Sequence, residues 1–215
     1  MSSWVARLYL WATYRLYDEF AWAYDAVSWL VSFGQWSAWR RMALAHVEGG
    51  RVLEMGFGTG VLLREMAQRG WFVYGLEPSP AMHRVTARKL ARAQMRMRVP
   101  RVRATAQRMP FGDGCFDAVV ATFPALYILD PATLFEVARV LMHPGGRFII
   151  AGLFVETDYT ILRRLAPFFF GRPSRDFLAI YRRMAAEAGF TLTMMPPDQQ
   201  ARGFRSPVFL LELGV

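Results

Sequence analysis

A run of alternating glycines preceded by an acid is the part of the sequence best suited to bind a small molecule. The segment RVLEMGFGTG ends a short apolar stretch with Gly56, Gly58 and Gly60. Glycines at the end of a strand let backbone N–H groups come close to a ligand. Glu54 lies just before this loop, and Glu77 follows 21 residues after Gly56. The pattern therefore predicts a nucleotide-like ligand at the carboxyl end of a strand.

The charge of Glu54 favours one of the two ligands that such a loop could hold. A nicotinamide dinucleotide would place a pyrophosphate beside this carboxylate, and like charges in a poorly hydrated cleft repel each other. S-adenosylmethionine carries an ammonium and a sulfonium and no phosphate, so the same carboxylate attracts it. Glu77 could accept both ribose hydroxyls through its two oxygens. Plainer roles are a strand-end salt bridge for Glu54 and a helix-start acid for Glu77.

Strand and helix patterns alternate along the chain around this loop. Short apolar runs predict strands at 52–55, 71–77, 99–104, 115–123, 147–154, 190–195 and 207–213. Between them, helices are predicted at 61–68, 80–97 and 131–142. This alternation favours an α/β fold with a doubly wound, parallel sheet. The last two strands have no long helix between them, which predicts an antiparallel pair.

The first 45 residues are predicted to form a helical cover over the rest of the chain. Trp22, Trp29 and Trp36 recur every seven residues along one helical stripe, and Gly34 is expected to separate two helices. Packing is the plain explanation of the stripe, whereas an active-site cover or a membrane-surface contact are the functional ones. We expect residues 46–215 to form the ligand-binding domain, in a chain that is a single domain overall.

The composition leaves the partners open and disfavours a metal site. The net charge of +9 is almost entirely arginine, because Lys89 is the only lysine. Such a charge suits nucleic acid or anionic lipid, but an arginine-rich solvated surface explains it more simply. Cys115 is the only cysteine, so no disulfide framework or zinc cluster is expected within the chain.

The hydropathy pattern predicts a cytoplasmic location. No stretch near the start reaches the length of about 18 apolar residues that a membrane span requires. Arg7 interrupts the first apolar run, and no cleavage site of a signal peptide follows it. Membrane association through the aromatic-rich segments stays an option alongside a cytoplasmic location.

Four blocks of the sequence together resemble the class I S-adenosylmethionine-dependent methyltransferases. They are VLEMGFGTG, GLEPSPAM, ATAQRMPFGDGCFDAVVATF and VARVLMHPGGRFII, in that order. They look most like the branch with the ubiquinone and menaquinone biosynthesis C-methyltransferases, and the resemblance covers residues 17–153. It implies a Rossmann-like sheet of seven strands, mostly parallel with a reversed last strand and with helices on both faces. It also implies S-adenosylmethionine as cofactor and methyltransferase activity.

The resemblance further implies which residues hold the cofactor. The residues assigned to it are Tyr24, Glu54, Gly56, Gly58, Gly60, Glu77, Pro78, Thr105, Ala106, Gln107 and Thr122. Tyr24, in the segment AYD, is expected to close over the cofactor, and residues 105–107 to flank adenine. Thr105 stands where this branch usually has Asp, so adenine recognition is expected to be weakened or shifted. Packing for Tyr24 and capping of a turn for Gln107 are the plainer roles.

The acceptor is expected to lie beyond the fourth strand. Residues 122–125, TFPA, lack the polar amine-orienting residue of enzymes that methylate adenine or amide nitrogen, which argues against such an acceptor. We assign Phe123, Tyr127 and Phe154 to the substrate. Residues 162–171, LRRLAPFFFG, are expected to form a lid, a membrane-surface helix or a buried packing helix. No catalytic residue is predicted, because methyl transfer requires a base only if the acceptor loses a proton.

The leading hypothesis is methyl transfer to a small hydrophobic acceptor such as a quinone-like ring or a lipid. One alternative is an RNA methyltransferase, for which a basic helix face is supplied by Arg84, Arg88, Arg92 and Arg96. Another is a non-catalytic S-adenosylmethionine-binding protein, since Thr105 departs from the family pattern and no base is evident. The oligomeric state is left open.

Overall fold

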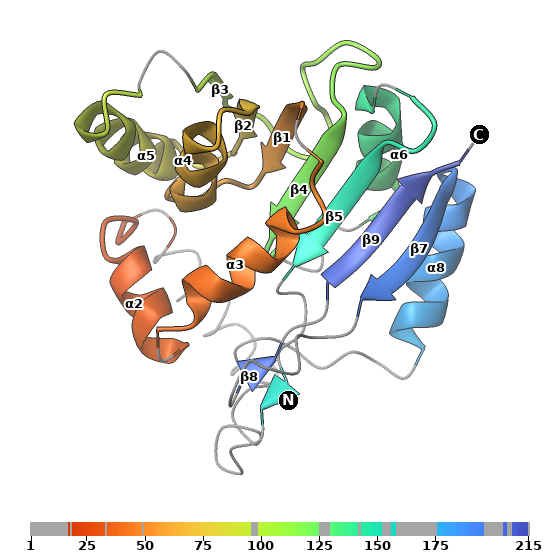
Figure 1. The fold of residues 1–215 in the computed structure, drawn as a ribbon, viewed down its shortest axis with the longest axis horizontal. Helices are drawn as coiled ribbons and strands as arrows, with labels where there is room; N and C mark the ends of the chain where they lie inside the picture. The colour runs from red at the N-terminus through yellow and green to blue at the C-terminus, as the bar shows by residue number, and fades with distance from the viewer. Residues whose placement is uncertain are drawn as a thin grey trace.

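A single mixed sheet of seven strands forms the centre of the computed structural model of the chain (Figure 1). The structure describes residues 17, 19–32, 34–48, 50–95, 99–124, 130–141, 143–151, 156–157, 176–195, 204–205 and 208–214. In spatial order, the strands are β3 (Arg101–Val102), β2 (Phe72–Leu76), β1 (Arg51–Met55), β4 (Ala118–Thr122), β5 (Arg147–Ala151), β9 (Val208–Leu213) and β7 (Phe190–Met195).

The direction of the strands confirms the predicted sheet. Neighbouring strands from β3 to β5 are parallel, and β9 is antiparallel to both β5 and β7. The chain builds β2 and β3 on one side of β1 and then places β4 on the other side. The junction of β1 and β4 is therefore the topological switch point, where open sheets of this kind bind ligands beyond the carboxyl ends of the strands.

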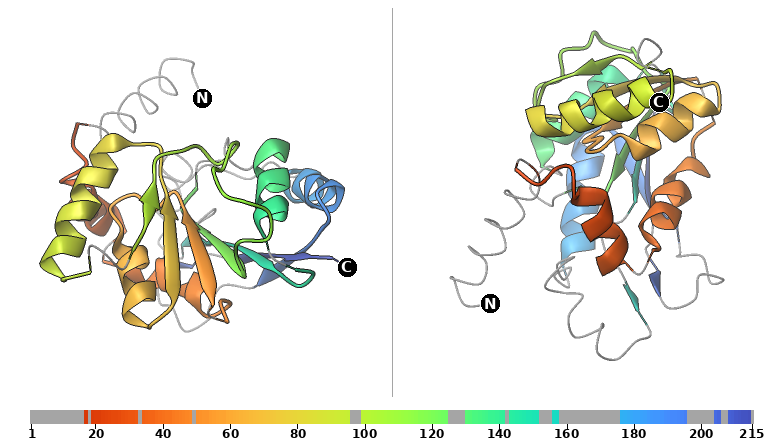
Figure 2. Two further views of the ribbon diagram at one scale, coloured as in Figure 1. Left: turned by 90° about the horizontal axis from the view of Figure 1, so that it is seen from above. Right: turned by 90° about the vertical axis from the view of Figure 1, so that its left-hand side faces the viewer.

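Helices lie on both faces of the sheet (Figure 2). They are α2 (Tyr24–Val31), α3 (Trp36–Leu44), α4 (Val61–Gln68), α5 (Pro80–Arg92), α6 (Pro131–Val140) and α8 (Phe177–Glu187). Successive residues of β1 point to opposite faces: Leu53 packs in a core with α6 and α8, and Val52 in a core with α3 and α4. Within the described ranges, no helix is long and apolar enough to cross a membrane.

Several predicted helices and strands were longer than the observed ones, for local reasons. The helix predicted at 80–97 ends at Arg92, because Ala93 closes it and Gln94 has a positive φ of 54°. The strand predicted at 115–123 ends at Thr122, because Phe123 has a φ of 51°. The strand predicted at 99–104 contains only the two residues of β3, which pairs with β2 alone at the edge of the sheet.

The predicted separation of two N-terminal helices at Gly34 is confirmed. Helices α2 and α3 are separated at Gly34, which has a φ of 81°. A short ladder of β6 (Glu156–Thr157) and β8 (Phe204–Arg205) was not predicted. Residues 1–16 and 162–171 lie outside the described residues. The division into a cover, 1–45, and a domain, 46–215, stays a prediction.

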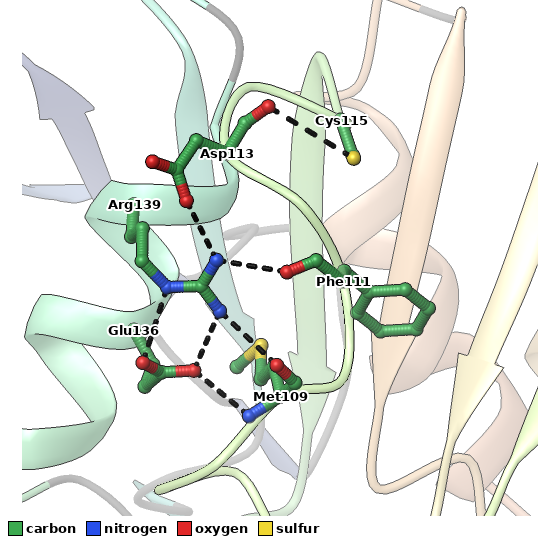
Figure 3. Close-up of polar contacts among 6 residues, drawn as sticks. All are labelled: Met109, Phe111, Asp113, Cys115, Glu136 and Arg139. Atoms are coloured by element: carbon green, nitrogen blue, oxygen red, sulfur yellow. Dashed lines mark hydrogen bonds and ion pairs between the residues drawn. The ribbon is translucent and has the colours of Figure 1, made fainter.

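Arg139 of α6 holds the long loop between β3 and β4 in place (Figure 3). Its guanidinium donates hydrogen bonds to the carbonyl oxygens of Phe111, at 2.8 Å, and Met109, at 3.1 Å. It also pairs with the carboxylates of Glu136 and Asp113, each at 2.8 Å. Glu136 in turn accepts a hydrogen bond from the N–H of Met109 at 2.8 Å. A partly exposed side of α6 thus fixes the loop whose first residues were assigned to adenine.

Replacing Arg139 is expected to destabilise the protein. Arg139→Ala leaves two backbone carbonyls and the Glu136 carboxylate without this donor, which should lower the free energy of unfolding by about 2–3 kcal/mol. Arg183→Ala is the matched control, because it removes an exposed i,i+4 pair with Glu187 and should cost less than about 0.5 kcal/mol. Urea unfolding measures both, and equal losses would contradict this role of Arg139.

Candidate cofactor site

The glycine loop lies at the switch point and adopts a backbone that favours glycine. Gly56, Gly58 and Gly60 have φ angles of 72°, 51° and 70°. A Cβ atom on Gly60 would lie 2.3 Å from the side chain of Thr86, so close packing against α5 requires this glycine. A Cβ atom on Gly56 or Gly58 would meet no atom within 4 Å. Open space above these two glycines lets a ligand approach the backbone.

A pocket opens beside this loop and brings together six of the fourteen predicted site residues. Its walls come from the glycine loop, from the ends of β1 and β4, and from the N-terminal helices. The lining residues are Tyr17, Tyr24, Trp36, Arg40, Glu54, Gly56, Phe57, Gly58, Thr59, Thr122 and Phe123. Five residues assigned to the cofactor therefore meet here with one assigned to the substrate.

Glu54 is a buried carboxyl group at the end of β1 and faces this pocket. Its side chain is 2% exposed, and its Oε2 atom has no hydrogen-bond partner among the described residues. Burial is the main cause that raises the pKa of Glu54 to about 8. The Arg40 guanidinium opposes this rise in pKa, Glu77 adds to it, and a backbone hydrogen bond with Leu63 opposes it. An ionised Glu54 is therefore only partly compensated within the described structure.

Glu77 braces the glycine loop from the end of β2. Its Oε2 atom accepts a hydrogen bond from the N–H of Gly58 at 3.0 Å, and its Oε1 atom accepts one from the N–H of Ser79 at 2.9 Å. Ser79 is also the N-cap of α5. Glu77 is buried and is not among the residues that line the pocket. A carboxylate accepts more than two hydrogen bonds, so these contacts are compatible with a role toward ribose.

The loop assigned to adenine lies outside the pocket lining. Thr105 is exposed, Ala106 is buried in the core with α6, and Gln107 donates a hydrogen bond to Asp130 at 3.4 Å. Asp130 is the N-cap of α6, so Gln107 is bound to the capping residue of that helix. Pro78 is exposed. Tyr127 and Phe154 lie outside the described residues, and all of these assignments stay predictions.

Helix α3 contributes two lining residues that the sequence analysis did not assign. The ring of Trp36 stacks on that of Phe123, with 3.7 Å between centroids and an angle of 12° between planes. Arg40, one turn further along α3, is 8% exposed, and its guanidinium lies 5.8 Å from the Trp36 ring centroid. The i,i+4 spacing of Trp36 and Arg40 was the available signal, because it places both on one face of a helix.

Phe123 is held in a strained backbone conformation directly after β4. Its φ of 51° is in the left-handed region, which a bulky residue seldom adopts. Its N–H donates to the carbonyl of Ala151 at 2.7 Å, and its ring is clamped by Trp36. Strain of this kind persists where the surrounding structure enforces it, and it is concentrated at functional sites.

Asp25 ties the N-terminal helix α2 to the glycine loop. Its Oδ1 atom accepts a hydrogen bond from the Thr59 hydroxyl at 2.6 Å, and its Oδ2 atom pairs with Lys89 of α5. Near it, the rings of Tyr17 and Tyr24 pack edge to face, with 5.2 Å between centroids. Burial raises the pKa of Tyr24, which therefore stays neutral in its place over the pocket. Helix α2 is thus positioned by an ion pair and by aromatic packing.

Comparison with known proteins places this fold and loop in a family. A family model described as a methyltransferase domain matches residues 53–150. The chain is 31% identical over 214 residues to a demethylmenaquinone methyltransferase of Thermus thermophilus, covering 93% of this chain and 96% of that protein. It is 37% identical over 139 residues to one of Clavibacter sepedonicus, covering 63% of this chain and 55% of that protein.

The chain belongs to the class I S-adenosylmethionine-dependent methyltransferases. Within that family it falls in the branch of the ubiquinone and menaquinone biosynthesis C-methyltransferases, as predicted. It spans 55–62% of the length of the first curated relatives it matches. The solved geranyl diphosphate C-methyltransferase of Streptomyces coelicolor has the same fold, with a TM-score of 0.60 at 16% identity, covering 82% of this chain and 78% of that chain.

The raised pKa of Glu54 predicts how stability changes with pH. The folded protein keeps a proton that the unfolded chain releases above its usual pKa near 4.5, so stability should fall as pH rises from about 5 to 8. Glu54→Gln removes this titration. The stability of the variant relative to the parent should therefore increase by about 1 kcal/mol per pH unit in that range and level off above it.

Urea unfolding at several pH values measures this difference. Glu187→Gln, on the exposed end of α8, is the matched control and should follow the parent at every pH. Parallel stability curves for the parent and Glu54→Gln would mean that Glu54 is ionised without cost in the folded protein.

Proposed function

We propose that this chain transfers a methyl group from S-adenosylmethionine to a small hydrophobic acceptor, a quinone-like ring or a lipid. The observation that carries the proposal is the Glu54 carboxyl group, buried at the switch point with Oε2 unpartnered among the described residues. A cationic group in the pocket would provide the missing charge and hydrogen bond. A pyrophosphate there would offer this carboxyl group no opposite charge and would disfavour its ionisation.

The other residues of the pocket suit the rest of such a cofactor. Gly56 and Gly58 leave open space beside the backbone, where their N–H groups can approach a ligand. Arg40 lines the same pocket and acts electrostatically on Glu54. Arg40 and an ionised Glu54 would be opposite charges in one pocket. They fit the carboxylate and the ammonium of the methionine part of the cofactor. Glu77 is the candidate for the ribose hydroxyls.

S-adenosylmethionine, when bound, supplies a methyl group on a positively charged sulfur. The residues of this chain contribute binding, alignment and exclusion of water. Trp36 and Phe123 close one side of the pocket with stacked rings, and Tyr17 and Tyr24 close another. No histidine among the described residues lines the pocket, so the proposal assigns no base.

The hydrophobic acceptor is supported by two kinds of observation. The aromatic residues that line the pocket favour an apolar ring over a charged substrate. Relatives named demethylmenaquinone methyltransferases share up to 37% identity with the chain. Since the chain spans only part of several of them, the acceptor of the whole protein is a proposal. The RNA alternative has basic helix residues in its favour, but residues 122–125, TFPA, lack the polar amine-orienting residue of enzymes that methylate adenine.

Transfer of a labelled methyl group tests the proposed function. The protein is incubated with S-adenosylmethionine labelled in its methyl group and with a naphthoquinol that carries a prenyl side chain. In parallel it receives a structured RNA. We expect label in the organic phase with the quinol and none in RNA. Glu54→Gln should lower the rate about a hundredfold, because it removes the charge that holds the donor, whereas Glu187→Gln should leave the rate unchanged.

The outcomes separate the three hypotheses. Label in RNA alone would establish the RNA alternative. Binding of S-adenosylmethionine without transfer to the quinol, to a lipid extract or to RNA would favour a non-catalytic protein. An undiminished rate in Glu54→Gln would contradict the proposed role of this carboxylate while leaving the activity itself intact.

A further inference from the structure

Exposed apolar side chains gather at α2. Of nine large hydrophobic residues that are exposed in the described part of the chain, five lie between residues 20 and 30. They are Phe20, Trp22, Val27, Trp29 and Leu30. Trp22 is 73% exposed, Leu30 67% and Trp29 62%. Single exposed hydrophobic residues are ordinary, but a cluster with one tryptophan on a short helix and another just before it marks an interaction surface.

A basic pocket adjoins this apolar cluster. It is formed between α2, α4 and α5, and its lining residues are Asp25, Val61, Arg64, Lys89, Arg92 and Ala93. Asp25 is the only acid among them, and its carboxylate is engaged by Lys89 and by the Thr59 hydroxyl. Three cationic side chains therefore face one carboxylate that is already paired.

The electrostatics of the pocket leave positive charge for an outside partner. The Nε atom of Arg64 is buried and has no acceptor among the described residues. Burial lowers the pKa of Lys89, Asp25 raises it, and Arg40 and Arg64 lower it further. Cations are thus close enough to disfavour one another, and an anion in the pocket would relieve this.

The apolar cluster and the basic pocket share one side of the molecule. Asp25 lines the pocket, and Trp29 is one turn further along α2, so the two lie on neighbouring positions of the same helix. The right-hand view of Figure 2 shows α2 facing the viewer, with α4 and α5 above it. Apolar side chains flanked by cations form the pattern of a helix that lies in a membrane interface.

We propose that α2 docks on a bilayer that contains anionic phospholipid, with the apolar cluster in the interface and a lipid phosphate at Arg64 and Arg92. The eight residues of α2 are far too short to span a bilayer, so the helix lies along its surface. A second copy of this chain would oppose its own basic pocket, and RNA would leave the two tryptophans exposed. The proposal does not rest on the proposed function.

Sedimentation with vesicles tests this docking surface. The full chain is mixed with vesicles of phosphatidylcholine alone or with added phosphatidylglycerol. We expect strong partition only with phosphatidylglycerol, weakened by salt. The double variant Arg64→Gln and Arg92→Gln should lose roughly thirtyfold in partition, from about 1 kcal/mol for each cation near the surface. The double variant Trp22→Ser and Trp29→Ser should lose at least about tenfold.

Matched controls change one exposed aromatic residue and one exposed arginine elsewhere. Phe135→Ser on α6 and Arg183→Gln on α8 alter exposed side chains away from α2 and should partition as the parent does. Circular dichroism of each variant checks that it is folded. A blue shift of tryptophan fluorescence with phosphatidylglycerol vesicles, lost in the Trp22 and Trp29 variant, would place α2 in the interface.

Three results would overturn the proposal. Equal partition to vesicles with and without phosphatidylglycerol would show that docking does not require anionic lipid. Unchanged partition of the tryptophan variant, with loss only in the arginine variant, would contradict insertion of the apolar cluster, because the basic pocket alone would then hold the vesicle. A stable dimer that dissociates in the tryptophan variant, together with no vesicle binding by the parent, would assign the cluster to a second copy.

Discussion

The desolvated carboxyl group of Glu54 is the constraint on which the account of the site depends. A strand end buried by helices on both faces offers little water, so a charge there requires a partner of opposite sign. The described structure supplies Arg40 at a distance and leaves Oε2 without a hydrogen bond. Such a group destabilises the empty protein and favours a cationic ligand. The site thus exchanges stability for binding, as functional sites commonly do.

The surrounding structure holds this carboxyl group and the glycine loop in a fixed relation. Glu77 anchors Gly58 from β2, Thr86 packs against Gly60 and donates a hydrogen bond to the carbonyl of Gly58, and Asp25 holds Thr59 from the N-terminal cover. Side chains from the end of β2, from α5 and from α2 therefore all contact the five-residue loop 56–60. Because α2 takes part in this contact, its environment, whether water or a membrane, bears on the geometry of the loop.

Much of this architecture was predictable, because it depends on local patterns. Alternation of apolar runs with helical segments predicted the sheet, and the missing helix before β9 predicted its reversed direction. The glycines and Glu54 lie close together in the sequence, at the end of β1 and in the loop that follows it, and could be read together. Trp36 and Arg40 were missed as pocket residues because their position depends on how α3 crosses β4 and β5, a tertiary contact. The end of α5 was missed because the positive φ of Gln94 has no sequence signature as strong as glycine.

Proton release on binding of S-adenosylmethionine tests the central claim most directly. If Glu54 is largely protonated in the free protein at pH 7 and ionised beside the bound cation, binding should expel close to one proton. Calorimetry in buffers of different ionisation enthalpy measures that number. The account predicts a release near one proton for the parent and near zero for Glu54→Gln. Binding of equal affinity with no proton release in either protein would contradict it.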